Sequence, residues 1–260
     1  MPEQDDLGRD VRLPAEIGAV VSIVPSLTEA VAASNAGLLA GVTNYCTHPA
    51  GLTTERIGGT KNPDTERIIA LRPEVVLANE EENRESDLAA LAAAGLAVWI
   101  TRIRTLPEAL DSLHRMLTVA CRLDRPSWLD AAAQAWAAVP EPVTPRTAII
   151  PIWRRPWMVL GRDTFAGDLL ARLGVANLYA GHAERYPRIE LAELAGSGAD
   201  LVVLPDEPYA FSAGDGPEAF PAIPAALVSG RHLTWYGPSL TEAPALLTAQ
   251  LGAARRSPGR

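Results

Sequence analysis

The sequence has few cysteines, no excess of positive charge and no long apolar run, and each shortage excludes a class of protein. Its two cysteines, Cys46 and Cys121, are too few for a disulfide framework or for a zinc site made of cysteine alone. The formal net charge of −8 argues against a nucleic-acid partner, because binding to phosphates needs a basic surface. No apolar run approaches the length of a membrane span, so we expect no insertion into a membrane.

Sequence signatures of catalysis are missing as well. The chain has no Gly-x-Ser-x-Gly motif, and Gly58-Gly59 lacks the spacing of a phosphate-binding loop. Neither His-x-x-x-His nor paired cysteines mark a metal site, which leaves His48 and His232 as isolated candidates for metal ligands. We therefore expect a protein that is not an enzyme and requires no cofactor.

The amino-terminal segment bears on location. Met1 to Asp6 is acidic and lacks the apolar core of a secretory signal peptide. From this segment we expect a cytoplasmic protein. If a leader has been removed, the expected location is periplasmic or otherwise extracytoplasmic.

What the sequence does contain is a regular alternation of strand-like and helix-like segments. The apolar run at 19–24 predicts a strand, and Ser26 with Glu29 predicts a capping box for a helix that ends near Asn35. Asn62-Pro63 predicts the start of another helix, with Asn62 as its cap and proline in its first turn. Such alternation is typical of a parallel sheet covered by helices.

The second half repeats this order, and its first predicted strand is "TAIIPIW" (147–153). Asp163 or Thr164 is the predicted cap of a helix that Gly174 ends. Residues 189–209 parallel residues 66–83, since each segment is a helix, a turn and a buried strand that ends in acids. The halves therefore predict two lobes of similar build.

Between the halves, residues 106–142 are rich in alanine and leucine at helical spacing, with a break at Asp124-Arg125-Pro126. We expect an α/β fold of two similar lobes with parallel sheets, joined by one long helix. The expected boundaries are an amino-terminal lobe at 1–124, a connecting helix at 125–142 and a carboxyl-terminal lobe at 143–260.

The stretch "PIWRRPWM" (151–158) places two tryptophans around two adjacent arginines, which suits neither a buried strand nor an ordinary solvent loop. Pro156 lacks a backbone donor, so the strand must end and the chain must turn there. Ligands bind beyond the carboxyl ends of the strands of open parallel sheets. We therefore expect Trp153, Arg154, Arg155 and Trp157 to line a ligand cleft; the alternative is that both tryptophans are core residues.

The two arginines need partners, because an unpaired buried charge is costly. The acids that follow equivalent strand ends are Glu80–Glu82 and Asp206-Glu207. We expect at least one arginine to pair with one of these acids.

Several segments occur in an order that resembles a known family. They include "VVSIVPSLTEAVAA", "GVTNYCTHP", "RIGGTKNPDTERIIALRPEVVLA", "IWRRPWMVLGRDTFAGDLLARLGVAN" and "LTWYGPSL". From about Val20 to Leu247 the chain resembles the helical-backbone substrate-binding proteins of ABC-type importers, most closely their periplasmic cobalamin-binding branch. The resemblance implies two α/β lobes joined by one long helix, with the ligand held in a cleft between the lobes.

The resemblance also implies roles for individual residues. It places aromatic walls of the cleft at Tyr45, Tyr186 and the Trp153–Trp157 loop, with Trp235 nearby. We expect Arg154, Arg155 and Glu207 to make the polar contacts. Broad apolar walls with few polar contacts suit a flat macrocycle.

Docking on an ABC permease uses one carboxylate per lobe in this family. Glu66 matches the first position, and Glu193 matches the second with an offset of one residue. The alternative is that both glutamates only complement the positive ends of their helices.

We therefore expect a binding protein for a cobalamin-like corrinoid or another bulky, partly flat metal chelate. One alternative is a bare divalent metal held by His48, His232 and acids of the cleft. Another is a cytoplasmic enzyme or regulator that reuses the importer fold, since a fold does not dictate function.

Overall fold

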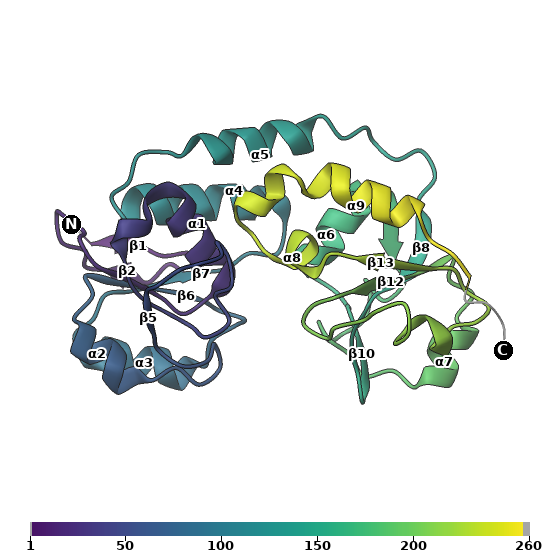
Figure 1. The fold of residues 1–260 in the computed structure, drawn as a ribbon, viewed down its shortest axis with the longest axis horizontal. Coiled ribbons are helices and arrows are strands. Elements are labelled where there is room, and N and C mark those ends of the chain that lie inside the picture. The colour runs from purple at the N-terminus through teal and green to yellow at the C-terminus, as the bar shows by residue number, and fades with distance from the viewer. Residues whose placement is uncertain (1, 257–260) are drawn as a thin grey trace. The chain divides into compact units, whose positions relative to one another are not determined.

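The structure, a computed structural model, describes residues 2–256 and contains two compact α/β units (Figure 1). The first unit comprises Met1–Ile103, Pro107–Ala131 and Tyr236–Pro238. The second comprises Arg104–Leu106, Ala132–Trp235 and Ser239–Arg260. The division between the units falls inside helix α5 (Ser127–Ala137), which is the helix predicted after the break at Pro126.

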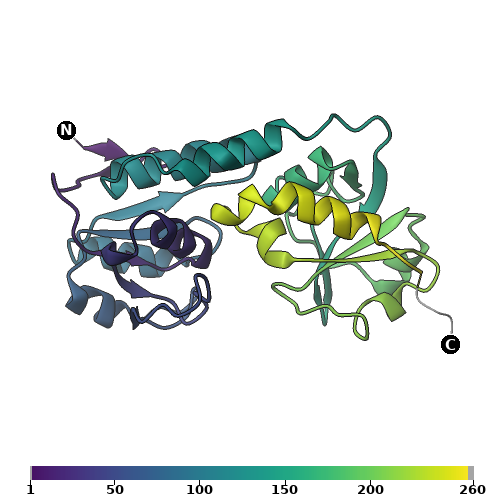
Figure 2. The same cartoon turned by 45° about the horizontal axis from the view of Figure 1, so that its top comes forward.

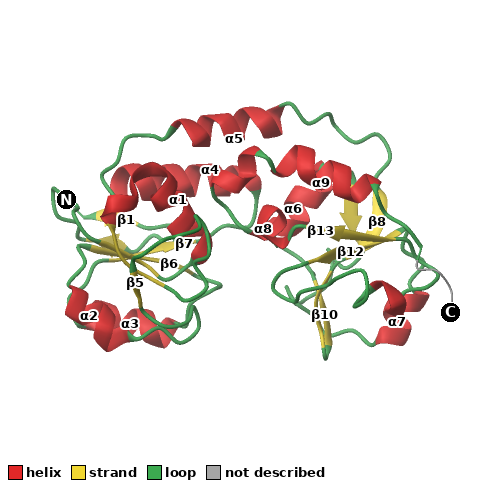
Figure 3. Ribbon diagram, viewed as in Figure 1, coloured by secondary structure: helices red, strands yellow, loops and turns green. Residues whose placement is uncertain are grey.

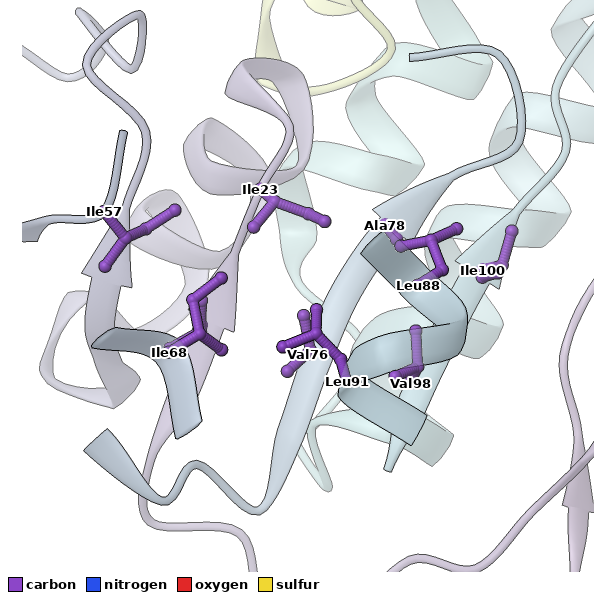
Figure 4. Close-up of a cluster of buried hydrophobic side chains, with 10 residues drawn as sticks. Ile23, Ile57, Ile68, Val76, Ala78, Leu88, Leu91, Val98 and Ile100 are labelled. Carbon is purple, nitrogen blue, oxygen red and sulfur yellow. The ribbon is translucent and has the colours of Figure 1, made fainter. Parts of the chain in front are cut away.

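The first unit is built on a five-stranded parallel sheet with the order β5-β4-β3-β6-β7. Helix α1 lies on one face, and α2 and α3 lie on the other (Figures 1 and 3). Ile68 of α2 and Leu88 and Leu91 of α3 pack on the strands in a buried cluster that Figure 4 shows. The strands across this sheet are β5 (Glu55–Arg56), β4 (Leu39–Val42), β3 (Val20–Ser22), β6 (Val75–Asn79) and β7 (Val98–Thr101). The helices are α1 (Pro25–Asn35), α2 (Thr65–Leu71), α3 (Glu85–Ala93) and α4 (Leu106–Arg115), which continues as a π-helical turn (Met116–Ala120).

The second unit has a four-stranded parallel sheet with the order β11-β8-β12-β13. Helices α6 and α9 lie on one face of this sheet and α7 on the other (Figures 1 and 2). The strands are β11 (Val175–Asn177), β8 (Arg146–Ile149), β12 (Leu201–Pro205) and β13 (Ala225–Val228). The helices are α6 (Phe165–Arg172), α7 (Leu191–Gly196), α8 (Gly230–Thr234) and α9 (Ala243–Gly252). The parallel sheets of both units confirm the predicted α/β class.

Two segments, around Asp6 and Arg255, bond to one edge strand of each sheet. The hairpin of β1 (Glu3–Gln4) and β2 (Asp10–Val11) precedes the first sheet, and the Asp6 N–H donates to the Ile100 carbonyl of edge strand β7 at 3.2 Å. On edge strand β13, Ala225 exchanges two backbone hydrogen bonds with Arg255, at 2.9 and 3.1 Å. One edge strand of each sheet, β7 or β13, therefore bonds at one point to backbone from the same chain.

Three local predictions need correction. Helix α1 begins one residue before Ser26, at Pro25, with Val24 at the cap position and no side-chain cap, because proline already has the φ of a first helical residue. In α2 the cap is Asp64, whose carboxylate accepts from the Arg67 N–H at 2.9 Å, so the predicted cap Asn62 lies outside the helix.

The third correction concerns the strand predicted across residues 147–153. It is two strands, because Pro151 cannot donate to a sheet ladder and β8 ends at Ile149. In contrast, the predicted cap Thr164 is confirmed, since its hydroxyl accepts from the Gly167 N–H. Within residues 2–256, none of the helices has the length and apolar character needed to cross a membrane.

Candidate functional site

The stretch that stands out in the sequence forms an antiparallel hairpin of β9 (Pro151–Arg154) and β10 (Trp157–Val159). Arg155 and Pro156, joined by a cis peptide bond, make the turn predicted at Pro156. Arg154 is paired with Trp157, and Trp153 with Met158. Paired residues share a face of the hairpin and successive residues alternate, so the two tryptophans point to opposite faces.

The two tryptophans have different surroundings. Trp153 is 42% exposed and meets Tyr209 edge-to-face, with ring centroids 5.6 Å apart. Trp157 is half-buried, stacks on Phe211 at 6.1 Å and meets Phe220 edge-to-face at 5.3 Å. Since Phe211 and Phe220 belong to the buried core of the second unit, core packing describes Trp157, whereas Trp153 is free to contact a ligand.

Arg154 is held between two acids. Its guanidinium forms ion pairs with Asp215 and, at 2.5 Å, with Glu218, and its side chain is only 17% exposed. It also lies over the Trp157 ring, 5.5 Å from the centroid. Arg155 lies exposed in the turn.

Within the second unit, Arg154 therefore pairs with Asp215 and Glu218 and not with the predicted Asp206-Glu207. A pairing with Glu80–Glu82 of the first unit stays a prediction. The loop after β12 (206–219) folds back on itself and returns Asp215 and Glu218 to the hairpin. The order of strands in the sequence indicates which residues follow a strand end. It does not indicate that a later part of the same loop folds back to the hairpin.

Glu218 sits in a polar setting that favours its charged form. Burial acts to raise the pKa of Glu218, but hydrogen bonds from the backbone N–H groups of Gly216 and Glu218 and the nearby Arg154 guanidinium outweigh it. The net result is a pKa below the ordinary value of a glutamate. The acid is thus suited to remain an anion beside Arg154.

Glu207 and Trp235 form a second polar pair in the same unit. The Trp235 indole N–H donates to the Glu207 carboxylate at 3.0 Å. Burial raises the pKa of Glu207, and the nearby Asp206 adds to this, while the Trp235 hydrogen bond and Arg231 oppose it. Close packing against Gly230 fixes the segment, because a Cβ there would lie 2.6 Å from the Glu207 backbone nitrogen.

Tyr186 belongs to a segment that runs alongside the hairpin. The Val159 N–H donates to the Pro187 carbonyl at 3.1 Å, and Met158 bridges to Arg188. The Arg185 guanidinium lies 5.6 Å from the centroid of the half-buried Tyr186 ring. Within the second unit the structure therefore places Tyr186 on a segment adjacent to the hairpin.

In the first unit, Tyr45 is 65% exposed and lies in the loop after β4. One side chain organises this loop: Arg56 donates to the carbonyls of Thr43 at 2.7 Å, Cys46 at 3.0 Å and Leu52 at 3.3 Å. Tyr45 is thus an exposed ring on a braced loop. That Tyr45 and the residues of the second unit serve one ligand stays a prediction.

The two predicted docking carboxylates occupy equivalent places in their own units. Glu66 is exposed in the first turn of α2, and Glu193 is exposed in the first turn of α7. The Tyr179 hydroxyl donates to Glu193 at 3.4 Å, and burial followed by the charge of Glu193 raises the pKa of Tyr179. Both carboxylates also lie where a helix dipole favours an anion.

The metal alternative finds little geometric support. His232 is buried, shares a 2.8 Å hydrogen bond with Ser229 and lies 3.6 Å from Glu242. His48 shares a hydrogen bond with Thr47 at 3.1 Å. In the part of the chain from 2 to 256, no three histidine, cysteine or acidic side chains cluster in a way that could hold a metal ion.

Comparison with known proteins places this geometry in context. A family model described as periplasmic binding protein matches residues 20–207. The vitamin B12-binding protein of Photorhabdus laumondii subsp. laumondii is 23% identical over 194 residues, which are 71% of this chain and 70% of that protein. The vitamin B12-binding protein of Vibrio cholerae serotype O1 is 22% identical over 190 residues, 70% of this chain and 67% of that one.

Solved structures share the fold. The periplasmic vitamin B12 binding protein BtuF of Vibrio cholerae has a TM-score of 0.74 at 18% identity, over 92% of this chain and 98% of that one. The periplasmic heme-binding protein RhuT from Roseiflexus sp. RS-1 has a TM-score of 0.73 at 19% identity, over 90% and 98% of the two chains. The family match covers well over half of the sequence, and the relatives are named as binding proteins. This chain belongs to the periplasmic binding protein family.

Proposed function

We propose that this protein binds a cobalamin-like corrinoid without transforming it. The observation that carries the proposal is the exposed ring of Trp153, supported by Tyr209, in a chain whose relatives are named vitamin B12-binding proteins. A corrinoid presents a broad, partly flat face, and a large exposed aromatic ring complements such a face at low entropic cost.

Other residues would complete the site. Tyr45, Tyr186 and Trp235 are the further aromatic candidates, and Arg155 and Glu207 are the candidates for polar contacts. Arg154 is a poorer candidate, because its guanidinium is already engaged by two carboxylates and a tryptophan ring. A corrinoid has amide side chains around its rim, which suits hydrogen-bonding partners better than a dense cluster of charge.

The protein would act outside the cytoplasm and deliver its ligand to an ABC permease. The family and the named relatives support this role, since members of the family are periplasmic binding proteins. Glu66 and Glu193, exposed in the first turns of α2 and α7, are the proposed contacts with the permease. Replacing both by glutamine should abolish delivery to a permease and leave ligand affinity unchanged.

The experiment is a titration of the purified protein with cobalamin, cobinamide and haem, followed by quenching of tryptophan fluorescence. Saturable quenching by cobalamin and cobinamide at micromolar concentration or below, reduced in Trp153→Ala, is the expected result. Stronger binding of haem would move the proposal to a porphyrin. No quenching by any of the three ligands would refute it.

The same titration with Ni²⁺ and Zn²⁺ tests the metal alternative. A structure of Helicobacter pylori CeuE with Ni(II) bound shares the fold, with a TM-score of 0.80 at 12% identity. Stoichiometric metal in protein purified without chelators, lost in a His232→Ala or His48→Ala variant, would favour that alternative over the corrinoid.

A further inference from the structure

Arg154 is the most heavily engaged charged side chain of the β9–β10 hairpin. Two carboxylates and one aromatic ring surround its guanidinium, and little of the side chain remains accessible. Arginine is suited to this role, because its planar fork can bond two acids while its face lies on a ring. An arginine held in this way has few donors left for a ligand.

The two acids belong to a loop that is itself cross-linked. The Tyr209 hydroxyl donates to the Asp215 carboxylate at 2.7 Å, and Ser212 and Asp215 exchange backbone hydrogen bonds at 3.0 and 3.2 Å. The Gly216 N–H donates to the Glu218 carboxylate at 2.6 Å. Asp215 thus links Arg154 to Tyr209, and Glu218 links Arg154 to the backbone of the loop.

These links end at the exposed aromatic ring. Tyr209 meets Trp153 edge-to-face, and Trp153 is the neighbour of Arg154 on strand β9. A continuous set of contacts therefore links Arg154 to Asp215, Asp215 to Tyr209, and Tyr209 to Trp153, which precedes Arg154 on strand β9. These contacts restrain the rings of Trp153 and Tyr209 before any ligand binds, and such restraint lowers the entropic cost of binding.

We propose that Arg154 is a positioning residue, which ties the hairpin to the loop 206–219 and keeps Trp153 and Tyr209 in a preformed binding face. It acts through Asp215 and Glu218 and does not contact the ligand. The expected effect on ligand affinity rests on the proposed function. The expected effect on the order of the loop 206–219 does not depend on any ligand.

Variants on the two sides of the ion pairs separate positioning from direct contact. Arg154→Gln removes the cation. Asp215→Asn with Glu218→Gln removes both anions and leaves Arg154 available to a ligand. Arg162→Gln is the matched control, since it removes an exposed arginine that pairs with Asp163 at 3.6 Å in the same unit.

The first measurement needs no ligand. Hydrogen exchange followed by mass spectrometry should show peptides from 206–219 exchanging about tenfold faster in Arg154→Gln and in the double variant than in the parent protein or Arg162→Gln. Peptides from α9 should be unchanged, which verifies that the unit remains folded. Unchanged exchange of the loop in both test variants would overturn the proposal whatever the ligand is.

The second measurement is affinity for cobalamin. Positioning predicts that Arg154→Gln and the double variant each weaken binding by about tenfold, and that neither adds to the loss caused by Trp153→Ala. Loss in Arg154→Gln with unchanged or tighter binding in the double variant would show that Arg154 contacts the ligand. If the double variant does not fold, Asp215→Asn alone decides between these outcomes. Failure of the parent protein to bind cobalamin would refute the proposed function. The hydrogen-exchange result would then remain as the test of whether Arg154 orders the loop 206–219.

Discussion

Trp235 donates its indole N–H to the carboxylate of Glu207, 28 residues earlier in the chain, across a distance of 3.0 Å. The pair joins the segment after β12 to the end of α8, close to Gly230, where no larger residue fits. Burial is the largest influence on the pKa of Glu207 and raises it.

Glu207 should lower stability at neutral pH. Because burial raises its pKa, the folded protein holds the Glu207 proton more tightly than the unfolded chain does. Its contribution to stability is then greatest below the ordinary glutamate pKa and falls as the pH rises through the raised value. Glu207→Gln removes the partly buried charge and keeps an acceptor for Trp235. It should therefore raise the free energy of unfolding at pH 7 by up to about 1 kcal/mol, allowing for solvent screening.

Urea unfolding at several pH values measures this effect. The gain should shrink as the pH falls and vanish well below the ordinary glutamate pKa, where the carboxyl is protonated in both states. Glu141→Gln, at an exposed loop position, is the control and should show no gain at any of these pH values. A gain that grows toward low pH would contradict the assigned cause.

The two tryptophans of the hairpin should separate stability from binding. Trp157→Ala removes a ring packed on Phe211 and Phe220, so it should lower the free energy of unfolding by roughly 2–4 kcal/mol. Trp153→Ala should cost less than about 1 kcal/mol in stability but weaken ligand binding by roughly 1–3 kcal/mol. Denaturant unfolding and fluorescence titration of the same two variants provide the comparison; equal stability losses would show that the rings are not distinguished as described.

Gly230 should tolerate no side chain. An added Cβ would lie 2.6 Å from the backbone nitrogen and from the Cβ of Glu207, and neither atom can move freely. Gly230→Ala should therefore lower the free energy of unfolding by about 2 kcal/mol or more. Gly196→Ala, at the end of α7 with open space around the added atom, should be neutral or stabilising by up to about 1 kcal/mol, and thermal melts of both variants check the contrast.

Arg56 should control the order of the loop that carries Tyr45. It donates to three backbone carbonyls between Thr43 and Leu52, and hydrogen bonds from a charged donor contribute roughly 1.5–3 kcal/mol. Arg56→Met should make residues 43–52 exchange and cleave faster, as limited proteolysis would show. Arg67→Met, which breaks an exposed pair with Glu55, should change stability by less than about 1 kcal/mol and leave that loop protected.

Much of the fold could be predicted because its signals are local. The buried strands β3, β6 and β12 are short apolar runs between turn residues, and Thr164 stands directly before the helix that it caps. The prediction of Ser26 as a helix cap was wrong, because Pro25, one residue earlier, already has the φ angle of a first helical residue. The three-residue strand β11 went unpredicted, since so short a segment has no measurable period.

Within the candidate site, the turn of the hairpin could be predicted, but the partners of Arg154 could not. The turn at Pro156 and the strand-end location of Asp206-Glu207 follow from proline chemistry and sheet topology. The pairing of Arg154 with Asp215 does not, because it depends on the path of a loop that turns through Gly216 at a φ of +131°. A sequence pattern shows which groups need partners; the partner itself is chosen by tertiary structure.

The pairing of both chain ends with sheet edges has a consequence for handling the protein. An edge strand with free N–H and C=O groups is a template for intermolecular β-pairing, and here Asp6 bonds to β7 while Arg255 pairs with β13. Trimming the chain past either residue would expose backbone groups of an edge strand to pairing with another molecule. Trimming past Arg255 would expose them beside Leu227, an exposed residue of β13. Purification tags belong beyond these residues, and we expect versions shortened past either of them to aggregate more readily than the parent chain, through the exposed strand.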